Sequence, residues 1–164
     1  MRLQTLVACL TVISGAALAQ EQQTTTSAQS AGWTSRCVSA ARGGPAACSV
    51  EQSVILQEGN RRLLTIRVDM PEAPRTATML FQAPLGILLP AGLSLQVDKA
   101  QPLQLELQSC DPNGCYASVP LGDPLLALLI SGASLRVGMQ STAREPITID
   151  IPLAGFTAAY ERIR

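Results

Sequence analysis

Short segments in which apolar and polar residues alternate fill much of this chain and restrict the folds open to it. One of them, residues 63–70, places four apolar side chains on one side, at Leu64, Ile66, Val68 and Met70. The same period of two recurs in residues 93–97, 103–108, 135–139 and 147–151. A period of two is typical of strands that bury one face. We therefore expect several half-buried strands, with a hairpin between Val97 and Leu103 across the sequence DKAQP.

One segment breaks this pattern and predicts a short helix. The sequence GDPLLALLISG offers Asp123 as N-cap, Pro124 at the first helical position and Gly132 just past the end. A buried strand is the alternative interpretation of its continuous apolar run. Many short strands, Gly and Pro between them and at most one short helix predict an all-β fold, an antiparallel β-sandwich.

The first nineteen residues resemble a secretory signal peptide. Arg2 gives a basic start, an apolar run follows to Leu18, and Ala17-Leu18-Ala19 forms a cleavage site before Gln20. The alternative is a lipoprotein signal in which Leu6-Val7-Ala8-Cys9 makes Cys9 a lipid anchor. Because the apolar run is short and no later one reaches about 18 residues, we expect no transmembrane span. Cleavage after Ala19 predicts a periplasmic or secreted protein.

The mature chain is close to neutral and forms one domain. Removing residues 1–19 takes Arg2 from the twelve basic side chains and Cys9 from the five cysteines, leaving eleven basic against twelve acidic side chains and four cysteines. This balance gives no broad attraction to nucleic acid. Residues 20–32 are small and polar and predict a flexible tether, and residues 33–164 predict a single disulfide-stapled domain.

The four cysteines of the mature chain predict two local disulfides. In CDPNGC, residues 110–115, Asp111, Pro112, Asn113 and Gly114 suit the four positions of a type I turn that brings Cys110 to Cys115. Cys37 and Cys48 flank a second reversal at Gly43-Gly44-Pro45, which predicts that they lie on neighbouring strands. Oxidised pairs are the rule in exported proteins.

Two other functions of these thiols remain as alternatives, a zinc site and a redox-active dithiol. Zinc ligand pairs usually have two to four intervening residues, whereas ten separate Cys37 from Cys48. Redox dithiols usually follow the pattern C-x-x-C beside a βαβ unit. The chain also has no histidine, the usual general base and the usual zinc ligand. We therefore expect neither an enzyme nor a metal site, and no cofactor.

Two clusters of charge are candidate sites. Arg61, Arg62 and Arg67 form the densest positive cluster, and the even spacing of Arg61 and Arg67 predicts that they share one sheet face. Such a candidate interaction patch would recognise a carboxylate or phosphate, and a solvated strand face is the alternative. Asp69 and Glu72 lie close enough in sequence to suggest an acid–base pair, and a solvated turn explains them equally well.

Several motifs together resemble one family of exported bacterial proteins. They are APLGILLPAGLSLQVD, then QSCDPNGCYASVPL, with Trp33-x3-Cys37 upstream and LAGFTAAYERI near the end. In this order they resemble the invasion-associated locus B family, from about Trp33 to Tyr160. The resemblance implies an immunoglobulin-like β-sandwich, a periplasmic or secreted location and a virulence-related role in host-cell invasion. It also favours a structural turn in PLGILLPAG, with glycines at positive φ.

We therefore expect an exported, non-enzymatic binding protein with a protein partner in the bacterial envelope or on a host surface. A periplasmic chaperone or stress-related accessory is the first alternative, and an unrecognised hydrolase the second. A chaperone should expose an apolar groove or an unpaired strand edge. An adhesin-like module should show one focused polar and aromatic patch, and an enzyme should show polar groups that converge in a pocket.

Overall fold

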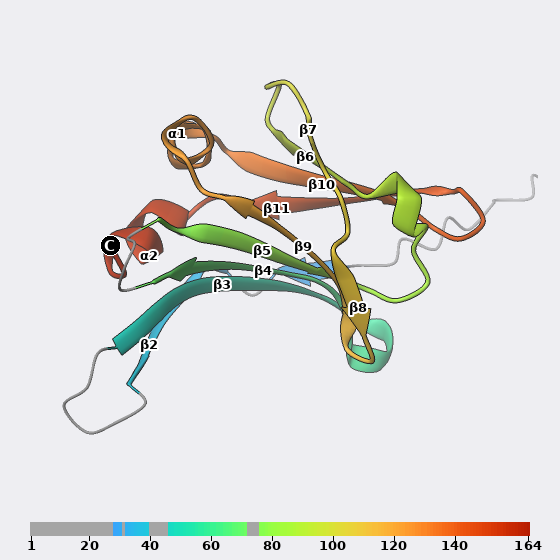
Figure 1. Cartoon of the computed structure of the whole chain (residues 1–164), viewed down its shortest axis with the longest axis horizontal. Helices are drawn as coiled ribbons and strands as arrows, with labels where there is room; N and C mark the ends of the chain where they lie inside the picture. The colour runs from blue at the N-terminus through green and yellow to red at the C-terminus, as the bar shows by residue number, and fades with distance from the viewer. Residues whose placement is uncertain (1–27, 31, 40–45, 72–75) are drawn as a thin grey trace, which may run out of the picture.

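The structure is a computed structural model that describes residues 28–30, 32–39, 46–71 and 76–164. Two antiparallel sheets face each other, and the two α-helices of the described chain lie at one end of the pair (Figure 1). This arrangement confirms the predicted all-β sandwich. The signal peptide, Cys9, Glu72 and the Gly43-Gly44-Pro45 reversal lie outside the described residues.

The larger sheet has seven strands. Its order is β1–β3–β4–β5–β9–β8, and β2 also pairs with β3. The strands are β1 (Ala28–Ser30), β2 (Thr34–Ser39), β3 (Ala46–Leu56), β4 (Arg61–Met70), β5 (Thr78–Ala83), β8 (Ser109–Asp111) and β9 (Gly114–Pro120). A 3-10 turn, η1 (Glu58–Asn60), joins β3 to β4. Because β3 is long, β1 and β2 both fit along its outer edge, one after the other.

The smaller sheet has four strands in the order β11–β10–β6–β7. They are β6 (Leu93–Val97), β7 (Leu103–Leu105), β10 (Ser134–Gln140) and β11 (Pro146–Pro152). The β6–β7 hairpin across DKAQP forms as predicted, with Leu93 opposite Leu105. A second 3-10 turn, η2 (Leu89–Ala91), leads into β6.

The alternating apolar residues meet between the two sheets and form the core. On β4 the buried apolar positions are Leu64, Ile66 and Val68, as the alternation predicts, and Thr65 on the other side of the strand is buried as well. Their counterparts in the smaller sheet are Leu93, Leu95, Val97, Leu135, Val137, Met139, Ile149 and Ile151. Burial of these aliphatic side chains is the main stabilising term, at about 25 cal/mol per Å² of apolar surface.

The segment 103–111 is divided between the two sheets. Its alternation predicts one strand, but β7 ends at Leu105 in the smaller sheet and β8 begins at Ser109 in the larger one. The chain therefore crosses from one layer to the other between them. In the preceding segment, Gly86 and Gly92 have φ of 85° and 61°, as the predicted turn in PLGILLPAG requires.

The predicted helix is present as α1 (Asp123–Ser131). Its N-cap is Gly122, without a side-chain hydrogen bond, so the assignment of Asp123 as N-cap was wrong by one position. Asp123 lies instead in the first turn, where its carboxylate interacts favourably with the positive end of the helix dipole. A six-residue helix, α2 (Phe156–Glu161), was not predicted.

The N-terminal segment enters the fold earlier than predicted. Residues 20–32 were expected to form a flexible tether, but Ala28–Ser30 pair with Val54–Leu56 of β3. Trp33 follows and ties this edge to the other sheet, because its indole N–H donates to the carbonyl of Pro152 at 2.9 Å. Its ring packs edge-on against the ring of Phe156 in α2, and the two ring centroids are 4.9 Å apart. These contacts close one side of the sandwich.

Candidate functional site

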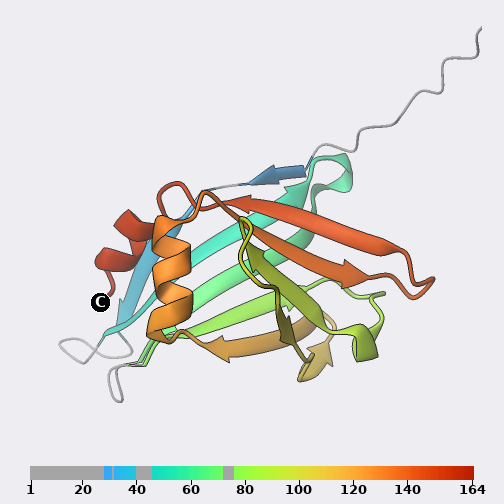
Figure 2. The same ribbon diagram turned by 90° about the horizontal axis from the view of Figure 1, so that it is seen from above.

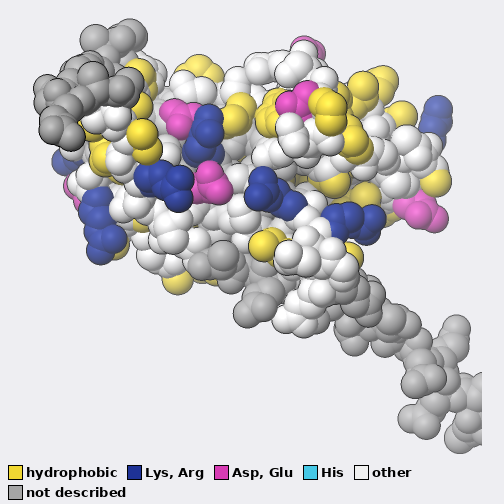
Figure 3. Space-filling view, turned by 90° about the horizontal axis from the view of Figure 1, so that it is seen from below, with side chains coloured by type: hydrophobic (Ala, Val, Ile, Leu, Met, Phe, Trp, Pro, Cys, Tyr) yellow, Lys and Arg dark blue, Asp and Glu magenta, His cyan; other side chains and the backbone are white. Residues whose placement is uncertain are grey.

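The outer face of the seven-stranded sheet carries several charged side chains. The smaller sheet lies against the opposite face, and both helices lie beyond one end (Figures 1 and 2). Nothing in the described chain covers the outer face. Seen from that side, Lys and Arg side chains form a row along the molecule with acidic side chains between them (Figure 3).

A β-bulge determines which arginines share this face. Val54 pairs with Leu64, but the next residue, Ile55, pairs with Arg62, so Leu63 is an extra residue in β4. Such an insertion reverses the alternation beyond it. The prediction that Arg61 and Arg67 share a face was therefore wrong, because Arg62 takes that place.

Arg62 and Arg67 line one shallow hollow on the outer face, with a volume of about 280 Å³. Tyr116 of β9 and Gln82 of β5 lie at its far side, and Glu51 of β3 contributes the acidic group. Arg61 lines a separate pocket between the two sheets at the end of the sandwich. The structure thus brings together two of the three predicted residues.

A second hollow of about 410 Å³ continues the first across β2, β3 and β4. Arg67 and Glu51 belong to both hollows, and Arg36 of β2 is the new cation. Arg36 was missed because the sequence-based prediction placed its neighbour Cys37 on a strand but did not assign the two faces of that strand. We call the surface formed by the following residues the arginine face: Arg36, Glu51, Arg62, Arg67, Asp69, Gln82 and Tyr116.

The arginine face carries a small excess of positive charge. Its three arginines face two carboxylates, and one of these, Asp69, accepts a hydrogen bond from Arg67 Nε at 3.0 Å. Both partners are exposed, so this ion pair contributes little to stability. Within the described part of the chain, Arg36 and Arg62 form no ion pair. Their guanidinium groups therefore remain available to a partner.

Only Asp69 of the predicted acidic pair lies within the described residues. Asp69 belongs to the arginine face through its contact with Arg67. Glu72 lies outside the described residues, so the proximity of the two carboxylates stays a prediction. The carboxylate of Asp69 neutralises a neighbouring cation, which is a structural role.

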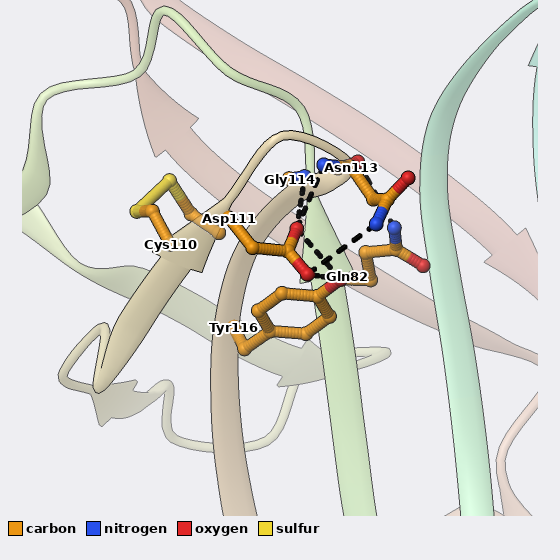
Figure 4. Close-up of a disulfide and its surroundings, with 7 residues drawn as sticks. Gln82, Cys110, Asp111, Asn113, Gly114 and Tyr116 are labelled. Atoms are coloured by element: carbon orange, nitrogen blue, oxygen red, sulfur yellow. Dashed lines mark hydrogen bonds between the residues drawn. A yellow bond between two sulfur atoms is a disulfide. The ribbon is translucent and has the colours of Figure 1, made fainter.

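The β8–β9 hairpin fixes the end of the arginine face that carries Tyr116 (Figure 4). One carboxylate oxygen of Asp111 accepts the backbone N–H groups of Asn113 at 2.7 Å and Gly114 at 3.1 Å. The Tyr116 hydroxyl donates to the same carboxylate at 3.1 Å. Gln82 Nε2 donates to the Asn113 carbonyl at 3.0 Å, which joins the turn to β5.

The surroundings of Asp111 and Tyr116 shift the pKa values of both side chains. The donated N–H of Asn113 is the largest cause that lowers the pKa of Asp111 below its ordinary value of 3.8. Partial loss of solvent raises the pKa of Tyr116 above 10.0, and its hydrogen bond to Asp111 adds to this. At neutral pH the hairpin therefore holds a carboxylate beside a neutral phenol.

Both predicted disulfides are present. Cys37 is directly opposite Cys48 on neighbouring strands, and Cys110 is directly opposite Cys115. The Cα atoms are 4.0 Å apart in each pair. The first bond joins β2, which carries Arg36, to β3, and the second closes the hairpin that carries Tyr116. The disulfides thus fix the strands at both ends of the arginine face.

In the described residues, no helix combines the length and apolarity required to cross a membrane. The family model of the Invasion associated locus B (IalB) protein matches residues 33–164. The Invasion protein B homologs of two Brucella abortus strains, 2308 and biovar 1 strain 9-941, are each 29% identical over 133 residues, covering 80% of this chain and 75% of theirs. The crystal structure of invasion associated protein b from Bartonella henselae matches with a TM-score of 0.70 and 23% identity, covering 80% of this chain and 89% of that one.

Proposed function

Because this chain belongs to the Invasion associated locus B family, we propose that it is an exported binding protein that catalyses no reaction of its own. Its arginine face would dock a protein partner that presents carboxylate groups. Such a partner belongs to the bacterial envelope or to a host surface, since both the two disulfides and the names of the relatives favour an exported protein.

The observation that supports this proposal is the composition and openness of the arginine face. Arg and Tyr are among the residues that most often provide binding energy at protein interfaces. Here Arg36, Arg62 and Tyr116 line open hollows on a sheet face that no other described element covers, rather than a closed cavity. A flat and open surface suits a macromolecule, whereas small substrates are usually enclosed.

The guanidinium groups of Arg36 and Arg62 favour an acidic partner. Guanidinium groups bind carboxylates through two parallel hydrogen bonds, which gives geometric specificity as well as attraction. Asp69 already occupies one edge of Arg67, so Arg36 and Arg62 are the stronger anchors. We expect the attraction to weaken as salt is added, because exposed charges are screened.

Cross-linking in living cells tests the proposal. A photoactivatable amino acid replaces Ser49, which lines the hollow next to Arg36, and mass spectrometry identifies the adducts. We expect one predominant protein adduct, with its yield about tenfold lower in Arg36→Glu, because interface anchors commonly contribute more than 1 kcal/mol. The yield should fall by a smaller factor in Arg67→Glu, because Asp69 already occupies part of that guanidinium group.

Arg136→Glu is the matched control. Arg136 is exposed and pairs with Asp150 at 2.8 Å, much as Arg67 pairs with Asp69, but it lies on the smaller sheet. Its adduct yield should equal that of the unmodified protein. Equal yields from Arg36→Glu, Arg67→Glu and Arg136→Glu would contradict docking through the arginine face.

A further inference from the structure

A pocket of about 480 Å³ opens between the two sheets at the end of the sandwich away from α1 and α2. This volume lies within the range of about 300–1,000 Å³ usual for small-molecule sites. It is called the end pocket here, and both sheets contribute to its apolar lining, which includes Leu63, Leu85, Ile87, Met139, Ile147 and Ile149.

The apolar lining continues from the core to the surface. Ile87 and Met139 are each 5% exposed and form the floor, whereas Ile147 and Leu85 are 36% and 56% exposed and form the rim. An apolar wall that stays open to water gains free energy when an apolar ligand covers it. The end pocket therefore suits a hydrocarbon chain that enters from the rim.

The charged groups of the end pocket are cationic. Arg61, Arg62 and Asn113 line it, and no acidic residue does. Neither arginine forms an ion pair within the described part of the chain. Arg62 also lines the hollow beside Tyr116 on the outer face. Of the two arginines, only Arg61 belongs to the end pocket and not to the arginine face.

The walls of the end pocket are fixed before any ligand binds. The Leu88 N–H donates to the Gln140 carbonyl at 2.8 Å, and the Thr142 N–H donates to the Gly86 carbonyl at 3.2 Å. A β-bridge pairs Ile87 with Ser141 between them. These bonds hold the 84–88 segment against the end of β10, so binding requires little ordering of the protein.

We propose that the end pocket binds an unbranched fatty acid. Its hydrocarbon chain would lie on the floor formed by Ile87 and Met139, and its carboxylate would pair with Arg61. A peptide fits less well, because its many backbone polar groups would meet an apolar floor without partners. A neutral or cationic lipid leaves the charge of Arg61 unmatched. The end pocket differs from the arginine face and takes a different class of ligand, so it goes beyond the proposed function.

Calorimetric titration of the purified mature protein, with both disulfides formed, tests this proposal with dodecanoate as the probe. We expect saturable binding with one ligand per chain, and no binding of dodecyltrimethylammonium, which has the same chain and the opposite charge. Arg61→Glu should weaken dodecanoate binding at least tenfold, since it removes a charge-assisted hydrogen bond and places a like charge beside the carboxylate. Ile147→Asp should weaken it similarly by placing a carboxylate in the apolar wall.

Arg136→Glu makes the same change of charge on the outer face of the smaller sheet and should bind dodecanoate like the unmodified protein. Circular dichroism and the retained disulfides would show that each variant is folded. The proposal is overturned if dodecanoate does not bind, if the cationic probe binds equally well, or if folded Arg61→Glu and Ile147→Asp bind dodecanoate unchanged. None of these outcomes bears on the cross-linking experiment, which varies Arg36 and Arg67.

Discussion

At the scale of single residues, Asp111 organises the turn on which one end of the arginine face depends. Its carboxylate accepts hydrogen bonds from two backbone N–H groups and from the Tyr116 hydroxyl. The N–H of Asn113 contributes most to the lowered pKa of Asp111. The ionised form is therefore favoured in the folded protein over the unfolded chain.

The sign of this shift predicts how stability depends on pH. The contribution of Asp111 is fully present above its unfolded pKa of about 3.8, and it is lost as the pH falls through the lower pKa of the folded state. Asp111→Asn should therefore be less stable than the unmodified protein at neutral pH, and the difference should shrink below about pH 4. Denaturant unfolding at pH 7 and at successively lower pH measures it. A difference that stays constant with pH would contradict the prediction.

Single residues also show where sequence patterns succeed and where they fail. The pairing of Cys110 with Cys115 was predictable, because a four-residue turn alone brings the two strands together. The sheet face on which Arg61 lies was not predictable, because an even spacing indicates a shared face only in a regular strand. The extra residue Leu63 interrupts β4, and no local signal in the sequence marks it.

At the scale of elements, the disulfide between β2 and β3 holds an edge strand in place. β2 pairs only with β3 within the described sheet, and it carries Arg36. In the chain-entropy model, closing a loop of this length stabilises the folded state by about 3 kcal/mol, and the shorter Cys110–Cys115 loop contributes about 2 kcal/mol.

Replacing both Cys37 and Cys48 with Ser should therefore lower the free energy of unfolding by about 2–3 kcal/mol. The partner adduct formed through Ser49 should also decrease, because β2 would no longer be fixed beside it. Urea unfolding and the cellular cross-link measure the two effects. The matched variant with Ser at Cys110 and Cys115 should lose slightly less stability. A larger loss from that variant would contradict the loop-length argument.

The elements differ in how far the sequence predicts them. Strands with strict alternation, such as β6 and β10, were predictable because a single buried face determines their pattern. The division of residues 103–111 into β7 and β8 was not, since alternation gives a strand's faces but not the sheet to which it belongs. Helix α2 was not predicted either. It packs on Trp33, which is distant in sequence, and a local pattern does not reveal such a contact.

At the scale of the whole molecule, the sandwich includes residues that precede the family match at Trp33. Ala28–Ser30 occupy the edge of β3 at Val54–Leu56. A chain that begins at Trp33 would leave the backbone groups of that edge without a partner, and unpaired edges favour association between molecules.

We therefore expect the chain beginning at Trp33 to self-associate more than the chain beginning at Gln20, and to unfold at a lower temperature. Sedimentation velocity over a range of concentrations measures the association, and calorimetry measures the unfolding. Identical behaviour of the two chains would mean that β1 contributes nothing to the larger sheet.

The contacts of Trp33 give the molecule a built-in optical reporter. The chain has one tryptophan, and its indole joins the edge of the larger sheet to the last residue of β11 in the smaller one. Indole emission depends on polarity and on nearby groups, so its wavelength and intensity should change when the two sheets separate at this side. Intrinsic fluorescence, without any added dye, therefore follows the opening of the sandwich in the unmodified protein.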